Sequence, residues 1–158
     1  MIIQKNFLTK KDFSFLNEKM TCNTFPWYFN KKNHEDSSIF NRQFCHVFFN
    51  NYQINSNYFE LITPILNILK PKALIRIKAN MNLPSENIYK NLPPHVDFDF
   101  HCKTAIFYLN TNDGFTSIED KSIESEENKM VIFNSQKKHY GTNCTNQAYR
   151  IVINFNYF

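Results

Sequence analysis

The sequence predicts a mainly β protein of the α+β class, a double-stranded β-helix (jelly roll) with two flanking helices. Two segments show helical apolar periodicity, and most of the remaining chain reads as a series of short strands separated by turn residues. Hydrophobic residues make up 42% of the 158 residues, enough for one core. The length and the lack of a linker predict a single domain over residues 1–158.

The two predicted helices lie in the first half of the chain. The first covers residues 9–20, where Thr9 and Asp12 resemble a capping box. The second covers residues 56–69 and is expected to stop at Pro71. Their apolar stripes are Phe13, Leu16 and Met20 in the first, and Tyr58, Leu61, Ile62, Ile65, Leu66 and Leu69 in the second.

Short runs rich in β-branched and aromatic residues predict the strands. Turn residues at 110–114, 122–128, 134–136 and 143–147 separate the later runs. Two irregular stretches, 30–41 and 81–92, are long enough to be functional loops. The predicted strands are residues 43–49, 72–79, 94–100, 103–110, 115–118, 129–133, 138–141 and 148–158.

Composition excludes several classes of protein. With only 2 glycines, the chain cannot form a glycine-rich phosphate loop. The net charge of +4 comes from scattered lysines, which favours a solvated surface over a nucleic-acid interface. No two cysteines form a CxxC pair, so we expect no zinc site and reduced thiols. The cysteines are Cys22, Cys45, Cys102 and Cys144.

The sequence has no apolar run long enough for a membrane helix, and its N-terminal segment lacks the order of a signal peptide. We therefore expect a soluble cytoplasmic protein with no membrane partner. The many Asn, Ile, Lys and Phe residues are typical of an A/T-rich genome, such as many phages carry. If a phage encodes the protein, the location becomes the host cytoplasm.

A run of polar side chains at every second position follows Pro94. Alternate side chains of a strand share one face, so His95, Asp97, Asp99 and His101 would lie together. An ordinary amphipathic strand has the same pattern. This run alone therefore does not decide between a surface strand and a metal site.

The last third of the chain adds a second histidine and a buried charge. His139 lies far downstream of Asp97, and Arg150 follows shortly after it at the start of an apolar strand. A charge leading into such a strand is costly unless it meets an anion. Two histidines and one carboxylate leave adjacent positions of an iron ion open for other ligands. The planar fork of Arg150 suits the far carboxylate of a dianionic co-substrate.

Together these motifs resemble the iron(II)/2-oxoglutarate-dependent oxygenase superfamily. The similarity is greatest to the prolyl 4-hydroxylase-like branch, in the short form found in phage genomes. The resemblance covers nearly the whole chain, which is more specific than a His-x-Asp pair alone. It is carried by residues 73–80, 95–97, 104–110, 114–116 and 130–155.

The resemblance implies an enzyme that binds Fe(II) and 2-oxoglutarate. It would use O2 to hydroxylate a peptidyl side chain of the prolyl type, or a small molecule, and release succinate and CO2. Arg150 would hold the co-substrate, bordered by Tyr108 and Asn110. The implied metal ligands, which are also the catalytic residues, are His95, Asp97 and His139.

Two departures from the family pattern stand out. The hydroxylases usually have Gly-Gly-Glu-Thr where this chain has residues 113–116, Asp-Gly-Phe-Thr. Many also carry a tyrosine beside the arginine of the strand before the metal motif, where this chain has Arg76 and Ile77. Because that tyrosine often contacts the co-substrate, Tyr108 is the candidate to replace it.

Neighbouring polar residues leave alternatives open. Spacing alone would let Asp99 replace Asp97 as the carboxylate ligand, although the resemblance favours Asp97. Asp99 could instead orient a ligand or meet the substrate, and His101 is expected to support a ligand or face solvent. Arg76 and Lys78 form either a solvent-facing side of their strand or a polar wall of the substrate mouth.

The remaining histidines, His34 and His46, lie outside the motif and are interpreted as structural. A second functional hypothesis also stays open at this point. It is a non-catalytic jelly-roll binding or virion-associated protein, in which the metal is structural or vestigial. Intact ligands together with Arg150 favour the enzyme.

Overall fold

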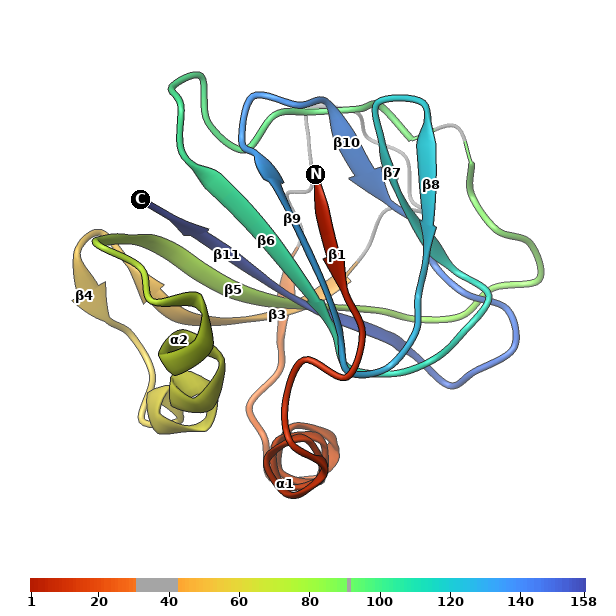
Figure 1. Ribbon diagram of the computed structural model, residues 1–158. Helices are drawn as coiled ribbons and strands as arrows, with labels where there is room; N and C mark the ends of the chain where they lie inside the picture. Colours follow the sequence, from red (N-terminus) through yellow and green to blue (C-terminus); the bar gives the residue numbers. More distant parts are fainter. Residues whose placement is uncertain (31–42, 91) are drawn as a thin grey trace.

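The computed structural model describes residues 1–30, 43–90 and 92–158 of the chain, with strands forming most of its regular structure (Figure 1). The elements in chain order are β1 (Ile2–Gln4), α1 (Lys10–Thr21), β2 (Tyr28–Asn30), β3 (Gln43–Asn50), β4 (Gln53–Ile54), a 3-10 helix (Phe59–Ile62), α2 (Thr63–Leu69), β5 (Leu74–Asn82), β6 (Lys103–Tyr108), β7 (Phe115–Ile118), β8 (Lys121–Glu124), β9 (Lys129–Asn134), β10 (His139–Gly141) and β11 (Arg150–Tyr157).

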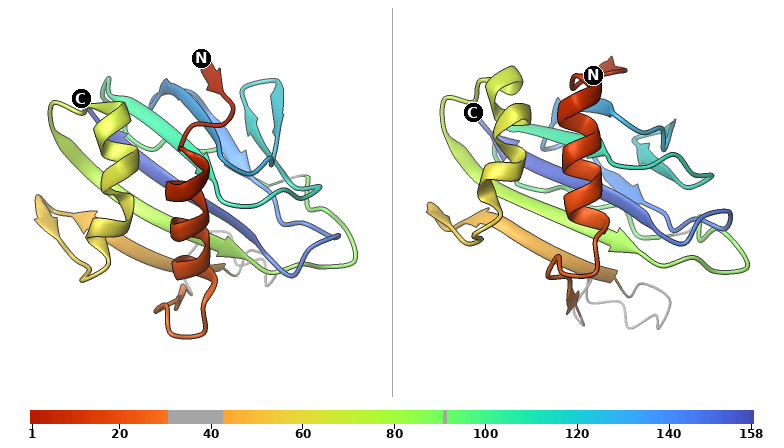
Figure 2. Two further views of the ribbon diagram at one scale, coloured as in Figure 1. Left: turned by 60° about the horizontal axis from the view of Figure 1, so that its bottom comes forward. Right: turned by 90° about the horizontal axis from the view of Figure 1, so that it is seen from below.

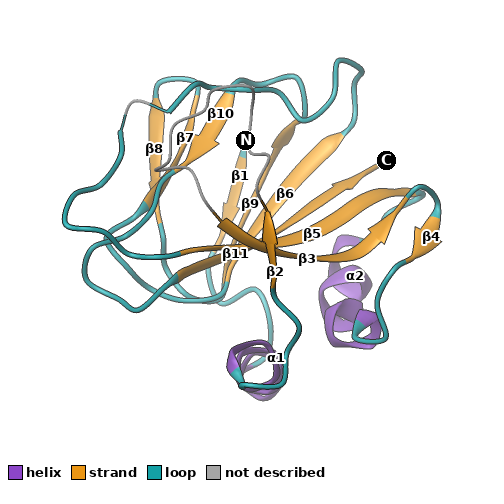
Figure 3. Ribbon diagram, turned by 180° about the vertical axis from the view of Figure 1, so that it is seen from behind, coloured by secondary structure: helices purple, strands orange, loops and turns teal. Residues whose placement is uncertain are grey.

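Two antiparallel sheets form the molecule. The large sheet has the order β1-β9-β6-β11-β5-β3-β2, with β4 paired to β3, and the small sheet has the order β10-β7-β8. The views from below show α1 and α2 lying across one face of the large sheet (Figure 2), and the view from behind shows the small sheet standing apart from it (Figure 3). The predicted jelly roll with two flanking helices is confirmed.

The core has two parts because the central strands are buried on both faces. On β11, Ile151, Ile153 and Phe155 belong to the cluster beneath the helices, whereas Val152 belongs to a smaller cluster with Ile106 of β6. Alternate residues of one strand thus enter opposite layers. On the same side of β11 as Val152, the polar side chains of Arg150 and Asn154 line the cavity described below.

Helix α1 begins as the sequence predicts. The Thr9 hydroxyl accepts a hydrogen bond from the Asp12 backbone N–H at 3.2 Å and donates to the Asp12 carboxylate at 2.7 Å. Leu16 and Met20 are fully buried against the large sheet. The cap fixes where the helix starts, and the apolar stripe fixes which face packs.

The second predicted helix, over residues 56–69, is divided. A 3-10 helix covers Phe59–Ile62, and α2 starts anew at Thr63. Pro64 explains the division, because proline lacks the backbone N–H and is tolerated only in the first turn of a helix. The helix ends at Leu69. Its C-cap residue Lys70 has a left-handed backbone conformation, with φ 48°, and immediately precedes Pro71.

The predicted strand over residues 94–100 is wrong. Within that segment only His95 pairs like a strand residue, in an isolated bridge with His139, and the chain then bends at Asp97 and Asp99. Pro93 and Pro94 lack the N–H groups that a strand ladder would use. Asp97 is held at the site by its side-chain contacts, described below, rather than by a regular ladder.

Short strands were missed by the sequence prediction. β1, β2 and β4 have two or three residues and mostly exposed side chains, so no alternation marks them. β8 (Lys121–Glu124) overlaps the first residues of the predicted turn at 122–128, where it pairs with β7. Most of the predicted loop at 30–41, including His34, lies outside the described residues. The loop at 81–92 begins within β5 and has no regular structure over residues 83–90.

In the described parts of the chain, no helix has the length and apolar character needed to cross a bilayer.

Candidate metal and co-substrate site

A cavity of about 400 Å³ lies between the two sheets. Its floor comes from β5, β6 and β11 of the large sheet, and its other side from β7 and β10. The irregular segment over residues 92–97 forms part of the rim. The three predicted metal ligands and the predicted co-substrate arginine all line it.

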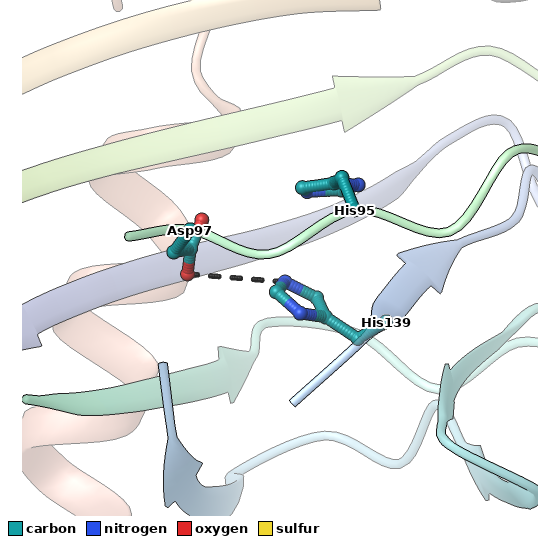
Figure 4. Close-up of side chains that lie close together, drawn as sticks. All are labelled: His95, Asp97 and His139. Atoms are coloured by element: carbon teal, nitrogen blue, oxygen red, sulfur yellow. Dashed lines mark ion pairs between the residues drawn. The ribbon is translucent and has the colours of Figure 1, made fainter. Parts of the chain in front are cut away.

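The predicted ligands His95, Asp97 and His139 come together. Their ligand atoms all lie within 4.8 Å of one another, and Nε2 of His139 is 3.8 Å from Oδ2 of Asp97 (Figure 4). Backbone hydrogen bonds fix the two histidines: the N–H of each donates to the carbonyl of the other, at 3.0 and 2.9 Å. Residues far apart in sequence are thereby placed around one point.

The hydrogen bonding of His139 prepares it for a metal. Its Nδ1 lies 3.0 Å from the Lys137 carbonyl, which can only accept, so Nδ1 carries the proton in the neutral ring. Its Nε2 then presents a lone pair, and this buried atom has no hydrogen-bond partner among the described residues. A metal-bound histidine has this arrangement, with its other ring nitrogen fixed by a carbonyl.

A row of cross-strand neighbours holds Asp97 in place. Asn156 of β11 is the register partner of both Arg76 on β5 and Thr104 on β6. Arg76 donates to Oδ1 of Asp97 at 2.8 Å, while Thr104 and Asn156 each donate to Oδ2 at 2.9 Å. Nε of Arg76 also donates to the side-chain oxygen Oδ1 of Asn156 at 3.1 Å. The carboxylate is therefore fixed by three strands of the large sheet.

The pKa of Asp97 is lowered overall. Burial acts in the opposite direction and would raise it, but burial is outweighed by the charge that His139 carries when protonated and by the charge of Arg76, aided by the hydrogen bonds from Asn156 and Thr104. A carboxylate that stays ionised is the form that binds a cation.

The two neighbouring alternatives lie elsewhere. Asp99 is exposed and does not line the cavity, and its backbone carbonyl accepts from Gln136. His101 is also exposed, with Nδ1 2.9 Å from the side-chain amide of Asn134. The geometry therefore supports Asp97 as the carboxylate of the cluster. His46 lies away from the cavity, hydrogen-bonded to Pro26 and Ser56.

Arg150, the first residue of β11, is 1% exposed. Its Nε donates to the Ser125 hydroxyl and its Nη2 to the Thr116 hydroxyl, both at 2.8 Å. No carboxylate within the described residues pairs with it. Burial lowers the pKa of this guanidinium, which shows how strongly it is desolvated. A buried cation held only by neutral groups is suited to an incoming anion.

Both glycines of the chain pack against Arg150. A Cβ at Gly114 would collide with the Asn143 carbonyl oxygen and would lie 2.7 Å from Cδ of Arg150. A Cβ at Gly141 would lie 3.2 Å from Nη1 of Arg150. The guanidinium thus occupies space that a side chain would otherwise fill.

The other two predicted co-substrate residues differ in position. The ring of Tyr108 lies 5.8 Å from Cζ of Arg150, and its buried hydroxyl has no hydrogen-bond partner among the described residues. Burial raises the pKa of Tyr108, so the hydroxyl stays protonated. Asn110 does not line the cavity: it donates to the Tyr149 carbonyl and accepts from the Ile151 N–H. Asn110 therefore positions the start of β11 and, in this geometry, does not meet a co-substrate.

Sequence reasoning missed the residues that support the site. Thr104 and Asn156 hold Asp97, and Thr116 and Ser125 hold Arg150. One signal for the first pair was available: each is a polar residue at an inward position of a strongly apolar strand. No sequence pattern marked Ser125.

Comparisons with solved structures find several oxygenases. A prolyl hydroxylase in complex with a hypoxia inducible factor oxygen degradation domain peptide fragment, from Trichoplax adhaerens, has a TM-score of 0.66 at 15% identity, covering 99% of this chain and 82% of its own. A Pseudomonas putida prolyl-4-hydroxylase has a TM-score of 0.60 at 14% identity, with 99% and 91% covered. An oxidoreductase of the 2OG-Fe(II) oxygenase family from Burkholderia pseudomallei has a TM-score of 0.66 at 8% identity, with 99% and 82% covered.

The chain has the fold of these oxygenases. At these identities the likeness concerns the fold alone, and it extends over nearly the whole chain. No protein-family profile matches the sequence, and no curated protein sequence is significantly similar to it. The case for an activity therefore depends on the side chains of the cavity.

Proposed function

We propose that the protein is an Fe(II)- and 2-oxoglutarate-dependent dioxygenase that hydroxylates an organic substrate. One observation carries the proposal. A cavity between the sheets has a two-histidine, one-carboxylate cluster and a fully buried arginine without a carboxylate partner among the described residues. A metal ion and a dicarboxylate together satisfy both features.

Each side chain of the cluster has a role in this proposal. His95, Asp97 and His139 would hold Fe(II), and the remaining positions of the ion would stay open. Bound Fe(II) would supply the redox chemistry that couples oxidative decarboxylation of 2-oxoglutarate by O2 to substrate hydroxylation, with succinate and CO2 as products. The buried Nε2 of His139 and the ionised carboxylate of Asp97 fit a divalent cation.

Arg150 would bind the distal carboxylate of 2-oxoglutarate. Its guanidinium is already oriented by two hydroxyl groups, so little freedom is lost on binding. The adjacent Tyr108 hydroxyl would donate to the same carboxylate, which gives its unpartnered oxygen a partner. Ile106 and Val152 line the cavity beside them and would exclude water from the methylene stem.

The substrate would be a peptidyl side chain or a small molecule. Two of the similar structures are prolyl hydroxylases, which makes a prolyl-type side chain a candidate by analogy. The cavity is open to the rim formed by residues 92–97, so a side chain could enter from outside.

Turnover tests the proposal directly. Purified protein with Fe(II), 2-oxoglutarate and O2 should form succinate, even without the substrate, and the His139→Ala variant should not. His101→Ala is the matched control, because it removes an exposed histidine outside the cavity. A wild-type protein that retains Fe(II) tightly but never consumes 2-oxoglutarate would support the binding-protein hypothesis instead.

A further inference from the structure

One wall of the cavity is more polar and more basic than a metal and 2-oxoglutarate require. Along β5 the side chains of Arg76, Lys78, Asn80 and Asn82 all line the cavity, at every second position. Arg76 is neutralised by Asp97. The other three have no assigned role in the chemistry proposed above.

Lys78 is a cation on this wall for which the described residues provide no counterion. Its side chain is half-buried, and it makes no hydrogen bond or ion pair with any residue that the structure describes. Burial lowers the pKa of Lys78, which accords with a desolvated ammonium group. A long side chain kept in a cavity at this cost, instead of extending into water, indicates a negatively charged ligand.

Two side-chain amide oxygens beside Lys78 also lack hydrogen-bond partners among the described residues. Asn154 on β11 is the register partner of Lys78, and Asn80 follows two residues along β5. The side-chain oxygens of both asparagines are buried with no hydrogen-bond partner among the described residues. Asn80 is 9% exposed, so water satisfies it poorly. Buried acceptors of this kind are normally hydrogen-bonded, and an N–H or O–H group of a bound ligand would supply the missing donor.

The balance of charges in the cavity indicates that the anion near Lys78 is not 2-oxoglutarate. One carboxylate of 2-oxoglutarate would meet Arg150, and the other would meet the metal ion, whose charge exceeds that of Asp97. Arg76 already faces Asp97. With Asp97 counted once, Asp97 and the 2-oxoglutarate dianion would bring three negative charges against five positive ones from Fe(II), Arg76, Lys78 and Arg150. Among the described residues, positive charge therefore remains uncompensated at Lys78 in the loaded site, and a second anion fits it.

We propose that Lys78 binds an oxyanion of the substrate, either a carboxylate or a phosphate, while the side-chain oxygens of Asn80 and Asn154 accept hydrogen bonds from N–H or O–H groups of the same molecule. This inference rests on the proposed oxygenase function and narrows its substrate to an anionic molecule. Lys78 lies two residues from Arg76, whose guanidinium holds the metal ligand Asp97, a spacing of about 7 Å along a strand. The carbon that is hydroxylated therefore lies within a few bonds of the anion.

A neutral prolyl ring fits this wall poorly. A ring of that type is recognised by apolar and aromatic contacts, whereas β5 offers an ammonium group and amides here. The selectivity of this chain is thus expected to differ from that of a hydroxylase acting on a neutral peptide side chain.

The experiment uses matched pairs of probes. The full protein, loaded anaerobically with Fe(II) and saturating 2-oxoglutarate, is titrated calorimetrically with N-acetyl-aspartate against N-acetyl-asparagine, N-acetyl-proline against N-acetyl-prolinamide, and glycerol 3-phosphate against glycerol. At least one anion should bind about tenfold or more tightly than its neutral partner, the gain expected from one charge-assisted hydrogen bond. The carboxylate and phosphate arms identify the oxyanion.

Variants then show whether Lys78 causes the preference for the anion. Lys78→Met should abolish it, Lys78→Arg should retain part of it, and Lys72→Met, which removes an exposed lysine outside the cavity, should leave it unchanged. The inference is overturned if no anion is preferred by the wild-type protein, or if the preference survives in Lys78→Met. It is also overturned if Lys78→Met weakens the binding of 2-oxoglutarate by the same factor as the binding of the anionic probe. Lys78 would then bind the co-substrate.

The loading step keeps this inference distinct from the proposed function. Formation of the Fe(II)–2-oxoglutarate complex is measured first, by its visible charge-transfer absorption. If the wild-type protein does not load, the oxygenase proposal fails. The same anion titrations are then made on unloaded Arg150→Met protein, with and without the Lys78→Met substitution, so that Arg150 does not contribute. Equal binding by these two proteins would refute the inference.

Discussion

Replacing Arg150 by alanine should weaken the binding of 2-oxoglutarate strongly while leaving the affinity for Fe(II) nearly unchanged. The guanidinium is 1% exposed and is already held by Ser125 and Thr116, so its loss removes a preformed, desolvated anion site. Breaking a buried pair typically costs about 3–5 kcal/mol. Because the cavity admits some water, we expect about 2–3 kcal/mol here, or about 30- to 150-fold in the dissociation constant.

A lysine at the same position separates charge from shape. Arg150→Lys should lose less affinity than Arg150→Ala, because the charge survives while the two-pronged contact does not. Anaerobic titration of 2-oxoglutarate into the Fe(II) protein, followed by the charge-transfer band, measures both constants. An unchanged constant for Arg150→Ala would refute the assignment and move the anchor to Arg76 or Lys78.

Three further predictions test neighbouring parts of the account. Gly141→Ala should fold but bind 2-oxoglutarate several-fold more weakly in the same titration, because its Cβ would lie 3.2 Å from Nη1 of Arg150. Thr104→Val should weaken Fe(II) by about tenfold in a metal-competition assay, because Asp97 loses one of its positioning hydrogen bonds. Protein stability should fall as the pH drops below about 6.5, because burial lowers the pKa of His46 in the folded state and the unfolded chain then takes up the proton first. Denaturation at several pH values should show this dependence diminished in His46→Phe, and an unchanged dependence would contradict it.

The sequence alone predicted the elements whose cause is local. The cap formed by Thr9 and Asp12 marks the start of α1, and the apolar run after Arg150 marks β11. The spacing of His95, Asp97 and His139 indicated a metal cluster. This motif consists of residue types that bind metals, and it can be recognised without knowing the exact strand boundaries. Arg150 could also be singled out from the sequence, because a charged residue at the start of an apolar strand is rare in a protein core.

Features that depend on strand register could not be predicted. Arg76, Thr104 and Asn156 become one row only because β5, β11 and β6 align at those positions. Likewise, β1 and β8 exist because they pair with β9 and β7, and their own residues give little signal. The segment at residues 94–100 shows the converse, since its alternating polar pattern is not that of a strand: His95 and Asp97 line the cavity, whereas Asp99 is exposed outside it.

The most direct test of the central claim is the absorption spectrum of the anaerobic protein titrated first with Fe(II) and then with 2-oxoglutarate. The account predicts a visible charge-transfer band that saturates at one iron and one 2-oxoglutarate per chain. The band should be lost in Asp97→Ala and retained in the matched Asp99→Ala variant, whose carboxylate lies outside the cavity. Absence of the band in the wild-type protein, or a band that survives in Asp97→Ala, would contradict it.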